Sequence, residues 1–268
     1  MIDDAGAEMT EAAFMFDTVT RAPEPARSRL GAAAVRLGGG VALAMPGSGS
    51  PYWNKALGFG LAEPFTPAVL DAVLDFYRAQ GVSQAVLQLV PAVLFDGFAQ
   101  IAAARGLERG NPWIKLGGDP AKVRAADTDL RIGPVPAAEA ETWADLLLSN
   151  FGMPAGDLTA MLAGTVGRQG WQPFGAWDGG RIVGGGNVFV SGEGAALNAA
   201  ATSPSHRGRG AQSALIAARA AVAAEAGARH LYAETGKPVG GAHNASLSNM
   251  VRAGLAPLYE RDNWIWRL

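Results

Sequence analysis

The residue types that could do chemistry are densest between His206 and Leu215, where two glycines alternate with two arginines. The segment joins a strand-like run to a helix-like run. Gly208 and Gly210 let backbone N–H groups turn toward one point, and the helix that follows adds the positive end of its dipole. Such a corner suits an anion, with pyrophosphate as the natural ligand. We call residues 207–212 the anion corner; the alternative is an ordinary surface loop with two solvated arginines.

The elements around the anion corner follow from turn residues and hydrophobic periodicity. Asp178-Gly179-Gly180 and Gly192-Glu193-Gly194 are hairpin turns, which predicts an antiparallel meander over residues 172–202. Alanines and apolar residues at helical spacing then predict a helix over 211–226, ended by Gly227. The remaining predictions are strands over 130–135, 229–235 and 263–268, and helices over 137–150, 155–165 and 244–253.

The first half of the chain ends with a weaker version of the same pattern. Residues 104–116 and 252–268 both run from a helix end through Gly-Leu to a strand that begins near an asparagine. We interpret this as a degenerate tandem repeat, although such alternation also recurs by chance in α/β proteins. The fold class is therefore α/β with a mixed sheet, in two copies. The predicted domains are 1–122 and 123–268, with the join in the polar segment 117–129.

The first copy lacks the anion corner. At the corresponding place it has residues 57–65, which contain no arginine and carry Glu63. We therefore expect it to bind no pyrophosphate, and instead to cover one side of the second copy and shape a substrate cleft.

Composition excludes several classes of protein. Of 268 residues, 49% are apolar and 17% charged, which is ample for a packed core. There is no cysteine, and the three histidines lack metal-ligand spacing, so we expect no metal site. A net charge of −2 predicts no nucleic-acid partner, and the absence of a long apolar run or a signal-like start predicts no membrane partner and a cytoplasmic protein. Serine-hydrolase and Walker motifs are also missing from the sequence.

The order of elements and the anion corner together resemble the GNAT superfamily of acyl-CoA N-acyltransferases. The hallmark of that family is Arg/Gln-x-x-Gly-x-Gly/Ala between its fourth strand and third helix. Here the six residues are Arg207, Gly208, Arg209, Gly210, Ala211 and Gln212. Glutamine stands at the last position, where the family usually has a small residue. The preceding hairpins and Asn244-Ala245-Ser246 at the start of the next predicted helix match the family's pattern.

The resemblance implies a site for acetyl-CoA as cosubstrate. Main-chain N–H groups of residues 207–212 would hold the pyrophosphate, with the arginines in contact with phosphate. The pantetheine arm would lie along the backbone of Ala200 and Thr202 in the manner of an added strand. Asn244 and Ser246 would contact the same arm, although for Asn244 a helix N-cap is an equally good interpretation.

Acyl transfer also needs a base and a donor for the leaving thiolate. The strand 229–235 carries Glu234, and a carboxylate at such a position must be paired or functional. We take Glu234 as the candidate general base, acting through water; a structural hydrogen bond is the alternative. The family's usual tyrosine donor is replaced by Met250, so Tyr259, Tyr232 or solvent must supply the proton.

The sequence thus predicts an N-acetyltransferase that moves acetyl from acetyl-CoA to a primary amine. The acceptor stays open among small metabolites, antibiotics, amino acids and protein N-termini, and a longer acyl group is possible. The rival interpretation is a non-catalytic acyl-CoA-binding or regulatory protein of the same fold. The oligomeric state is not predicted.

Overall fold

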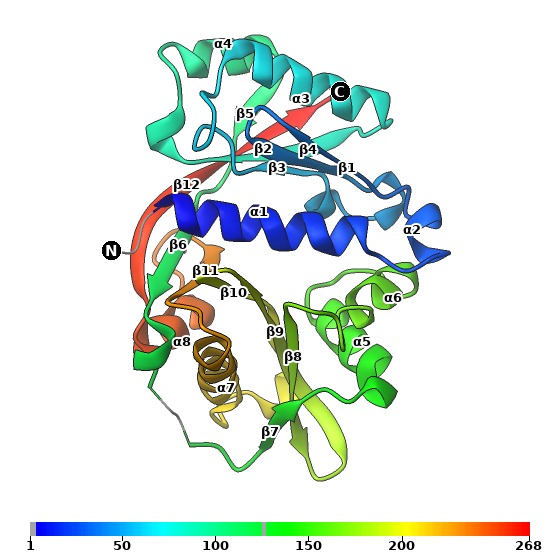
Figure 1. The fold of residues 1–268 in the computed structure, drawn as a ribbon, viewed down its shortest axis with the longest axis vertical. Coiled ribbons are helices and arrows are strands. Elements are labelled where there is room, and N and C mark those ends of the chain that lie inside the picture. Colours follow the sequence, from blue (N-terminus) through cyan, green and yellow to red (C-terminus); the bar gives the residue numbers. More distant parts are fainter. Residues whose placement is uncertain (1–3, 125–126) are drawn as a thin grey trace.

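The computed structural model describes residues 4–124 and 127–268, and Figure 1 shows its two halves lying on either side of helix α1 (Asp4–Thr20). Residues 1–3 and 125–126 belong to the predicted start and the predicted linker and lie outside the described residues. Helix α1 was not predicted. It packs against strands of both halves and therefore lies between them.

The N-terminal half is a small sheet covered by helices. Glycine and proline end its elements, and the apolar face of α3 packs against the sheet through Leu70, Val73 and Leu74. Its elements are α2 (Ala26–Arg29), β1 (Ala33–Leu37), β2 (Gly40–Ala44), β3 (Lys55–Leu57), α3 (Pro67–Ala79), β4 (Gln84–Leu89), α4 (Phe98–Ala104), β5 (Leu107–Arg109) and β6 (Trp113–Gly118).

The C-terminal half matches the predicted order of elements. The meander and the strand-corner-helix unit form where the turn residues place them, but the last strand begins at Ala256 and not at Asn263. The elements are β7 (Arg131–Pro134), α5 (Ala140–Asn150), α6 (Asp157–Ala163), β8 (Trp171–Asp178), β9 (Arg181–Ser191), β10 (Gly194–Thr202), α7 (Ala211–Glu225), β11 (His230–Gly236), α8 (Ala245–Ala253) and β12 (Ala256–Arg267).

One continuous mixed sheet runs through both halves in the order β1-β2-β3-β4-β12-β6-β11-β10-β9-β8-β7, and β5 pairs with β12. Each half contains one parallel pair, β3 with β4 and β10 with β11. The other pairs among the described residues are antiparallel. The equivalent position of the two parallel pairs confirms the tandem repeat, and the mixed α/β fold class is likewise confirmed.

The two copies exchange their last strands. Strand β6 belongs to the first copy, yet it pairs with β11 of the second. The end of β12 belongs to the second copy, yet residues 262–267 pair with β4 of the first. The similar segments 104–116 and 252–268 therefore end in β6 and β12, and each of these strands pairs with a strand of the other copy. The domain boundary at residue 122 remains a prediction. It divides the sequence, whereas the sheet continues across both halves.

Helix α1 fills the space between the halves. Helical periodicity places Ala12, Met15 and Val19 on one stripe, and these side chains are buried in a core shared with α5 and α6. Glu8 and Glu11 lie on the adjoining surface of the helix and are almost fully buried. Helices α7 and α8 cover the opposite face of the C-terminal sheet (Figure 1). Two carboxylates thus enter the centre of the molecule on the buried side of α1.

Candidate active site

The parallel strands β10 and β11 separate along their length. They pair only from Gly194 to Ala196, opposite residues 230–232. Strand β10 stays paired with β9 as far as Thr202, with an irregularity between Asn198 and Ala201 where Ala199 has a φ of 46°. In the described chain no backbone pairing joins β11 to β10 beyond Ala196. The edge of β10 that contains Ala200 and Thr202 therefore has no strand partner on the β11 side among the described residues, and an added strand could pair there.

Arg219 supports this irregular stretch from the side of α7. Its guanidinium is 1% exposed and donates to the carbonyls of Leu215 and Asn187, at 2.9 Å each, and to that of Asn198 at 3.5 Å. Burial lowers the pKa of the Arg219 guanidinium to about 9. A buried cation thus fixes the backbone at the point where β10 bends.

The anion corner has the backbone that the glycines predicted. Gly208 and Gly210 have φ values of 80° and 78°, and Gly210 immediately precedes α7. Glycine takes this left-handed conformation without the steric cost that a side chain brings. Gly210 provides no side-chain cap, and no side chain among the described residues accepts from the N–H groups of the first turn of α7. A helix start of this kind favours an anion.

The two arginines of the anion corner differ in what they contact. Arg209 donates to Asp129 and Asp178, and these hydrogen bonds raise the pKa of its guanidinium. Its charge is therefore already balanced. Arg207 is exposed, and its contact is a hydrogen bond of 3.3 Å from Nε to the Thr202 carbonyl. Arg207 is thus the cation of the corner that remains accessible to phosphate.

Gln212, Asn244 and Ser246 take different places. The Gln212 side chain donates to the Thr202 hydroxyl at 2.8 Å and so joins the corner to the end of β10. Asn244 is the N-cap of α8: it accepts from the Leu247 N–H at 3.0 Å and donates to Thr235 and Gly236. Ser246 is exposed in the first turn of α8. The alternative interpretation of Asn244 as a cap is therefore the one whose contacts form.

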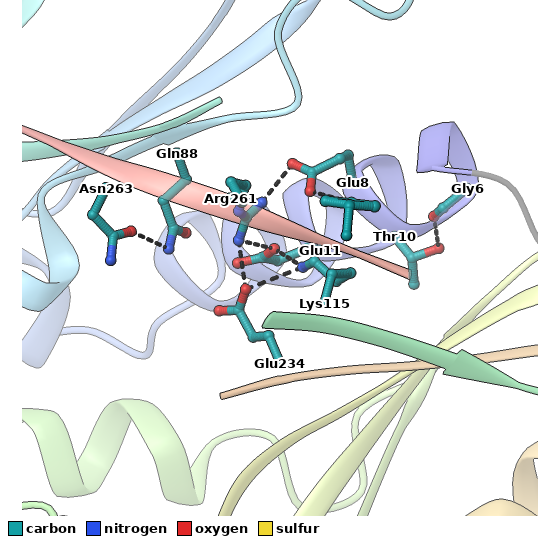
Figure 2. Close-up of polar contacts among 10 residues, drawn as sticks. Gly6, Glu8, Thr10, Glu11, Gln88, Lys115, Glu234, Arg261 and Asn263 are labelled. Carbon is teal, nitrogen blue, oxygen red and sulfur yellow. Dashed lines mark hydrogen bonds and ion pairs between the residues drawn. The ribbon is translucent and has the colours of Figure 1, made fainter. Parts of the chain in front are cut away.

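Glu234 lies in a cluster of five charged side chains (Figure 2). Its Oε2 accepts from Lys115 Nζ at 3.1 Å and from Arg261. The same two cations contact Glu11, and Arg261 also contacts Glu8. We call Glu8, Glu11, Lys115, Glu234 and Arg261 the ionic cluster.

Burial and charge oppose each other within the ionic cluster. Burial by itself would raise the pKa of the Glu11 carboxyl, but Arg261 and Lys115 together hold that pKa well below its usual range. Burial likewise works against the charged form of Arg261, yet the neighbouring carboxylates raise the pKa of its guanidinium. Glu11 and Arg261 are therefore held in their charged forms by their partners in the cluster.

Within this cluster Glu234 is the carboxylate nearest to solvent. Its side chain is 14% exposed, against 1% for Glu8 and 3% for Glu11. Its Oε1 has no hydrogen bond among the described residues. Glu234 also lies on the α1 side of β11, whereas Leu231 and Ala233 face α7 and α8, as the alternation of the strand predicted.

Tyr259 was a candidate proton donor for the leaving thiolate, and Met250 occupies the position where the family usually has a tyrosine donor. The Tyr259 hydroxyl donates to Glu8, and burial and then the Glu8 charge raise the pKa of that hydroxyl. Met250 is 5% exposed and packs in the core beneath α8. The methionine is thus a packing residue, and the tyrosine proton is held by a carboxylate.

The sequence alone missed four members of the ionic cluster. Lys115 stands inside the apolar run from Trp113 to Leu116, and a charge in a buried strand is the one signal that it gives. Glu8, Glu11 and Arg261 become neighbours only through α1 and the exchanged strand β12. No group of metal-ligating side chains occurs within residues 4–124 and 127–268. A helix long and apolar enough to span a membrane is likewise absent from that part of the chain.

Comparison with known proteins identifies this arrangement. A sequence model of the acetyltransferase (GNAT) family matches residues 141–245. Residues 141–245 belong to the GNAT family. This segment contains the open edge of β10, the anion corner and Glu234. The match supports an acyltransferase activity. No curated protein sequence matches the chain.

Solved structures extend the GNAT fold to the whole chain. A GCN5-related N-acetyltransferase from Kribbella flavida has a TM-score of 0.67 at 15% identity, over 98% of this chain and 96% of that one. A tandem GNAT protein from the clavulanic acid biosynthesis pathway has a TM-score of 0.62 at 18% identity, over 98% and 93%. A GCN5-related N-acetyltransferase from Sphaerobacter thermophilus has a TM-score of 0.58 at 13% identity, over 88% and 76%. Both halves thus share the GNAT fold.

Proposed function

We propose that the C-terminal GNAT domain transfers an acetyl group from acetyl-CoA to a primary amine of a small molecule or peptide. The observation that carries the proposal is the juxtaposition of an uncapped helix start at Gly210 with the open edge of β10. The corner suits a pyrophosphate and the open edge suits an extended amide chain. Coenzyme A carries both groups.

The chain's own residues account for the proton that must leave the amine. The amine nitrogen attacks the thioester carbonyl carbon, the C–S bond breaks, and the coenzyme A thiolate leaves. Glu234 takes the ammonium proton through a water at Oε1, because its other oxygen is held by Lys115 and Arg261. The thiolate takes its proton from solvent, since the Tyr259 hydroxyl is bound to Glu8.

The proposal is tested by incubating the protein with acetyl-CoA and a panel of amines and measuring free thiol. Amine-dependent release of thiol is expected. Coenzyme binding without thiol release from any amine would favour the rival function, a non-catalytic acyl-CoA-binding protein. Buried Met250 in place of a tyrosine is the observation that keeps this rival open.

We expect Arg207→Glu to weaken acetyl-CoA binding by roughly a hundredfold, because a carboxylate replaces the accessible cation next to the pyrophosphate. Titration calorimetry measures the change. Arg27→Glu is the matched control, since Arg27 is exposed on α2 of the other half. Gly210 is a poor choice for this test, because an added Cβ would lie 2.3 Å from the Asp127 carbonyl oxygen. Equal affinity in Arg207→Glu and the wild type would remove the anion corner from the proposal.

We also expect one coenzyme per chain. In the N-terminal half the equivalent helix start is closed: Thr66 caps α3 by accepting from the Val69 N–H, and Pro67 has no N–H to offer. The space beside Gly60 is occupied, since an added Cβ there would lie 2.4 Å from Val93. Calorimetric stoichiometry checks this. A value near two would mean that the first copy retains a coenzyme site.

A further inference from the structure

Lys55 is a buried cation that the proposed reaction leaves unused. It lies on β3 of the N-terminal half and is 2% exposed. Its ammonium has no hydrogen-bond partner among the described residues. It lies 4.1 Å from the centre of the Tyr52 ring and 5.6 Å from that of Trp113. Two aromatic faces stabilise a cation but cannot accept its N–H bonds as an anion would, so this site is incomplete.

Lys55 and Tyr52 lie within electrostatic reach of carboxylates of the ionic cluster. Burial raises the pKa of the Tyr52 hydroxyl; the Lys55 charge opposes this, and the charges of Glu234 and Glu11 add to it. These four side chains therefore share one electrostatic environment. Tyr52 is packed against the same large hydrophobic cluster as Ala199 and Ala201 of the irregular stretch of β10. Lys55 thus acts on Glu11 of the ionic cluster, and Tyr52 beside it lies within reach of the Glu11 and Glu234 charges.

The strand pairing leaves room next to the two aromatic rings. Trp113 stands opposite Gly236, and Lys115 opposite Glu234, so all four lie on one face of the sheet. A Cβ at Gly236 would meet only the Trp113 indole nitrogen, at 3.9 Å. Tyr52 and Trp113 are both partly exposed, unlike Lys55 behind them. A ligand would have to displace these aromatic side chains to reach the ammonium, since Lys55 is 2% exposed.

We propose that Lys55 binds a carboxylate of the acceptor, so that the acceptor is an amino carboxylate such as an amino acid. This inference rests on the proposed acetyl transfer. The other two cations of the region, Lys115 and Arg261, already contact carboxylates of the ionic cluster. Among the described residues Lys55 is the one of the three that contacts no carboxylate, and a single negative charge matches it. A phosphate dianion would bring one charge too many.

The test compares amines in matched pairs, each amino acid against its own carboxamide. With wild-type protein we expect kcat/KM for thiol release to be roughly tenfold or more higher for the free carboxylate. Lys55→Met should remove this preference by lowering kcat/KM for the carboxylate to the level of the carboxamide measured with the same variant. Methionine fills a similar volume and breaks no hydrogen bond, so the variant should fold. Lys122→Met, at an exposed lysine, is the control and should keep the preference.

Three results separate the two proposals. A wild type that acetylates carboxamides as well as carboxylates, or a Lys55→Met variant that keeps the preference, overturns the role of Lys55 and leaves acetyl transfer standing. If no amine releases thiol, the transfer proposal fails, and equilibrium binding of amino acids in the presence of coenzyme A decides about Lys55. Loss of that binding in Lys55→Met supports the carboxylate site; equal binding in variant and wild type overturns it.

Discussion

Replacing Arg261 with methionine should lower the free energy of unfolding by about 3–5 kcal/mol at neutral pH, the range for breaking a buried ion pair from one side. Arg261 is fully buried and donates to Glu8, Glu11 and Glu234. Its loss leaves Glu11 and Glu234 with Lys115 as their hydrogen-bonded cation in the cluster, and leaves Glu8 with the Tyr259 hydroxyl and no cation there. Urea unfolding followed by circular dichroism measures the change.

Arg267→Met is the matched control on the same strand. Arg267 contacts Glu108, and the two side chains are 51% and 74% exposed. Exposed pairs of this kind contribute within about 1 kcal/mol. A similar loss in both variants would mean that β12 tolerates neither substitution for reasons other than the ionic cluster.

The stability lost in Arg261→Met should also depend on pH. The folded-state pKa of Glu11 is depressed, so the stability that its ionised form contributes is present above its unfolded pKa and is lost as the pH falls toward the folded value. Arg261 is the leading cause of that depression. The difference between wild type and variant should therefore shrink as the pH falls below about 4, the usual range for a glutamate. A difference that stays constant from pH 7 to pH 3 would contradict this account.

Glu234→Gln should keep acetyl-CoA affinity and lower amine-dependent turnover by roughly a hundredfold or more, the usual effect of losing a general base. The amide keeps the size of the side chain but cannot accept the proton. The defect should be partly relieved at high pH, where the amine is already neutral. Steady-state kinetics across pH, with calorimetric affinity for acetyl-CoA, measures both quantities.

Glu11→Gln separates catalysis from the charge balance of the cluster. Glu11 contacts the same two cations but is 3% exposed, so it has little access to an acceptor. Glu11→Gln should cost stability and leave turnover near the wild-type rate for the folded fraction. Wild-type turnover in Glu234→Gln would make Glu234 a structural residue of the cluster.

Much of the C-terminal half could be predicted because its signals are local. Asp178-Gly179-Gly180 closes a hairpin whatever surrounds it, and Gly227 ends α7 by its own backbone. The anion corner is likewise a property of six consecutive residues. The repeat was visible because both copies keep the same order of helix end, Gly-Leu and strand.

The same local reasoning could not place the charged residues. Alternation along β11 put Glu234 on the face opposite Leu231 and Ala233, which the structure bears out. It could not say that Lys115 would be the cross-strand neighbour, because that pair joins residues 119 positions apart. Local reasoning also could not decide the role of Asn244, because a helix N-cap and a ligand contact favour the same residue type at this position.

The sequence by itself determined the order of elements, the α/β class, the tandem repeat and the backbone of the anion corner, since each depends on residues close together in the chain. The tertiary structure decided which strand lies beside which. It exchanged β6 and β12 between the copies and placed α1 across the sheet, and so assembled the ionic cluster. Periodicity indicates which face of a strand or helix a residue lies on. Which distant strands pair depends on how the whole chain packs, and no local sequence pattern contains that information.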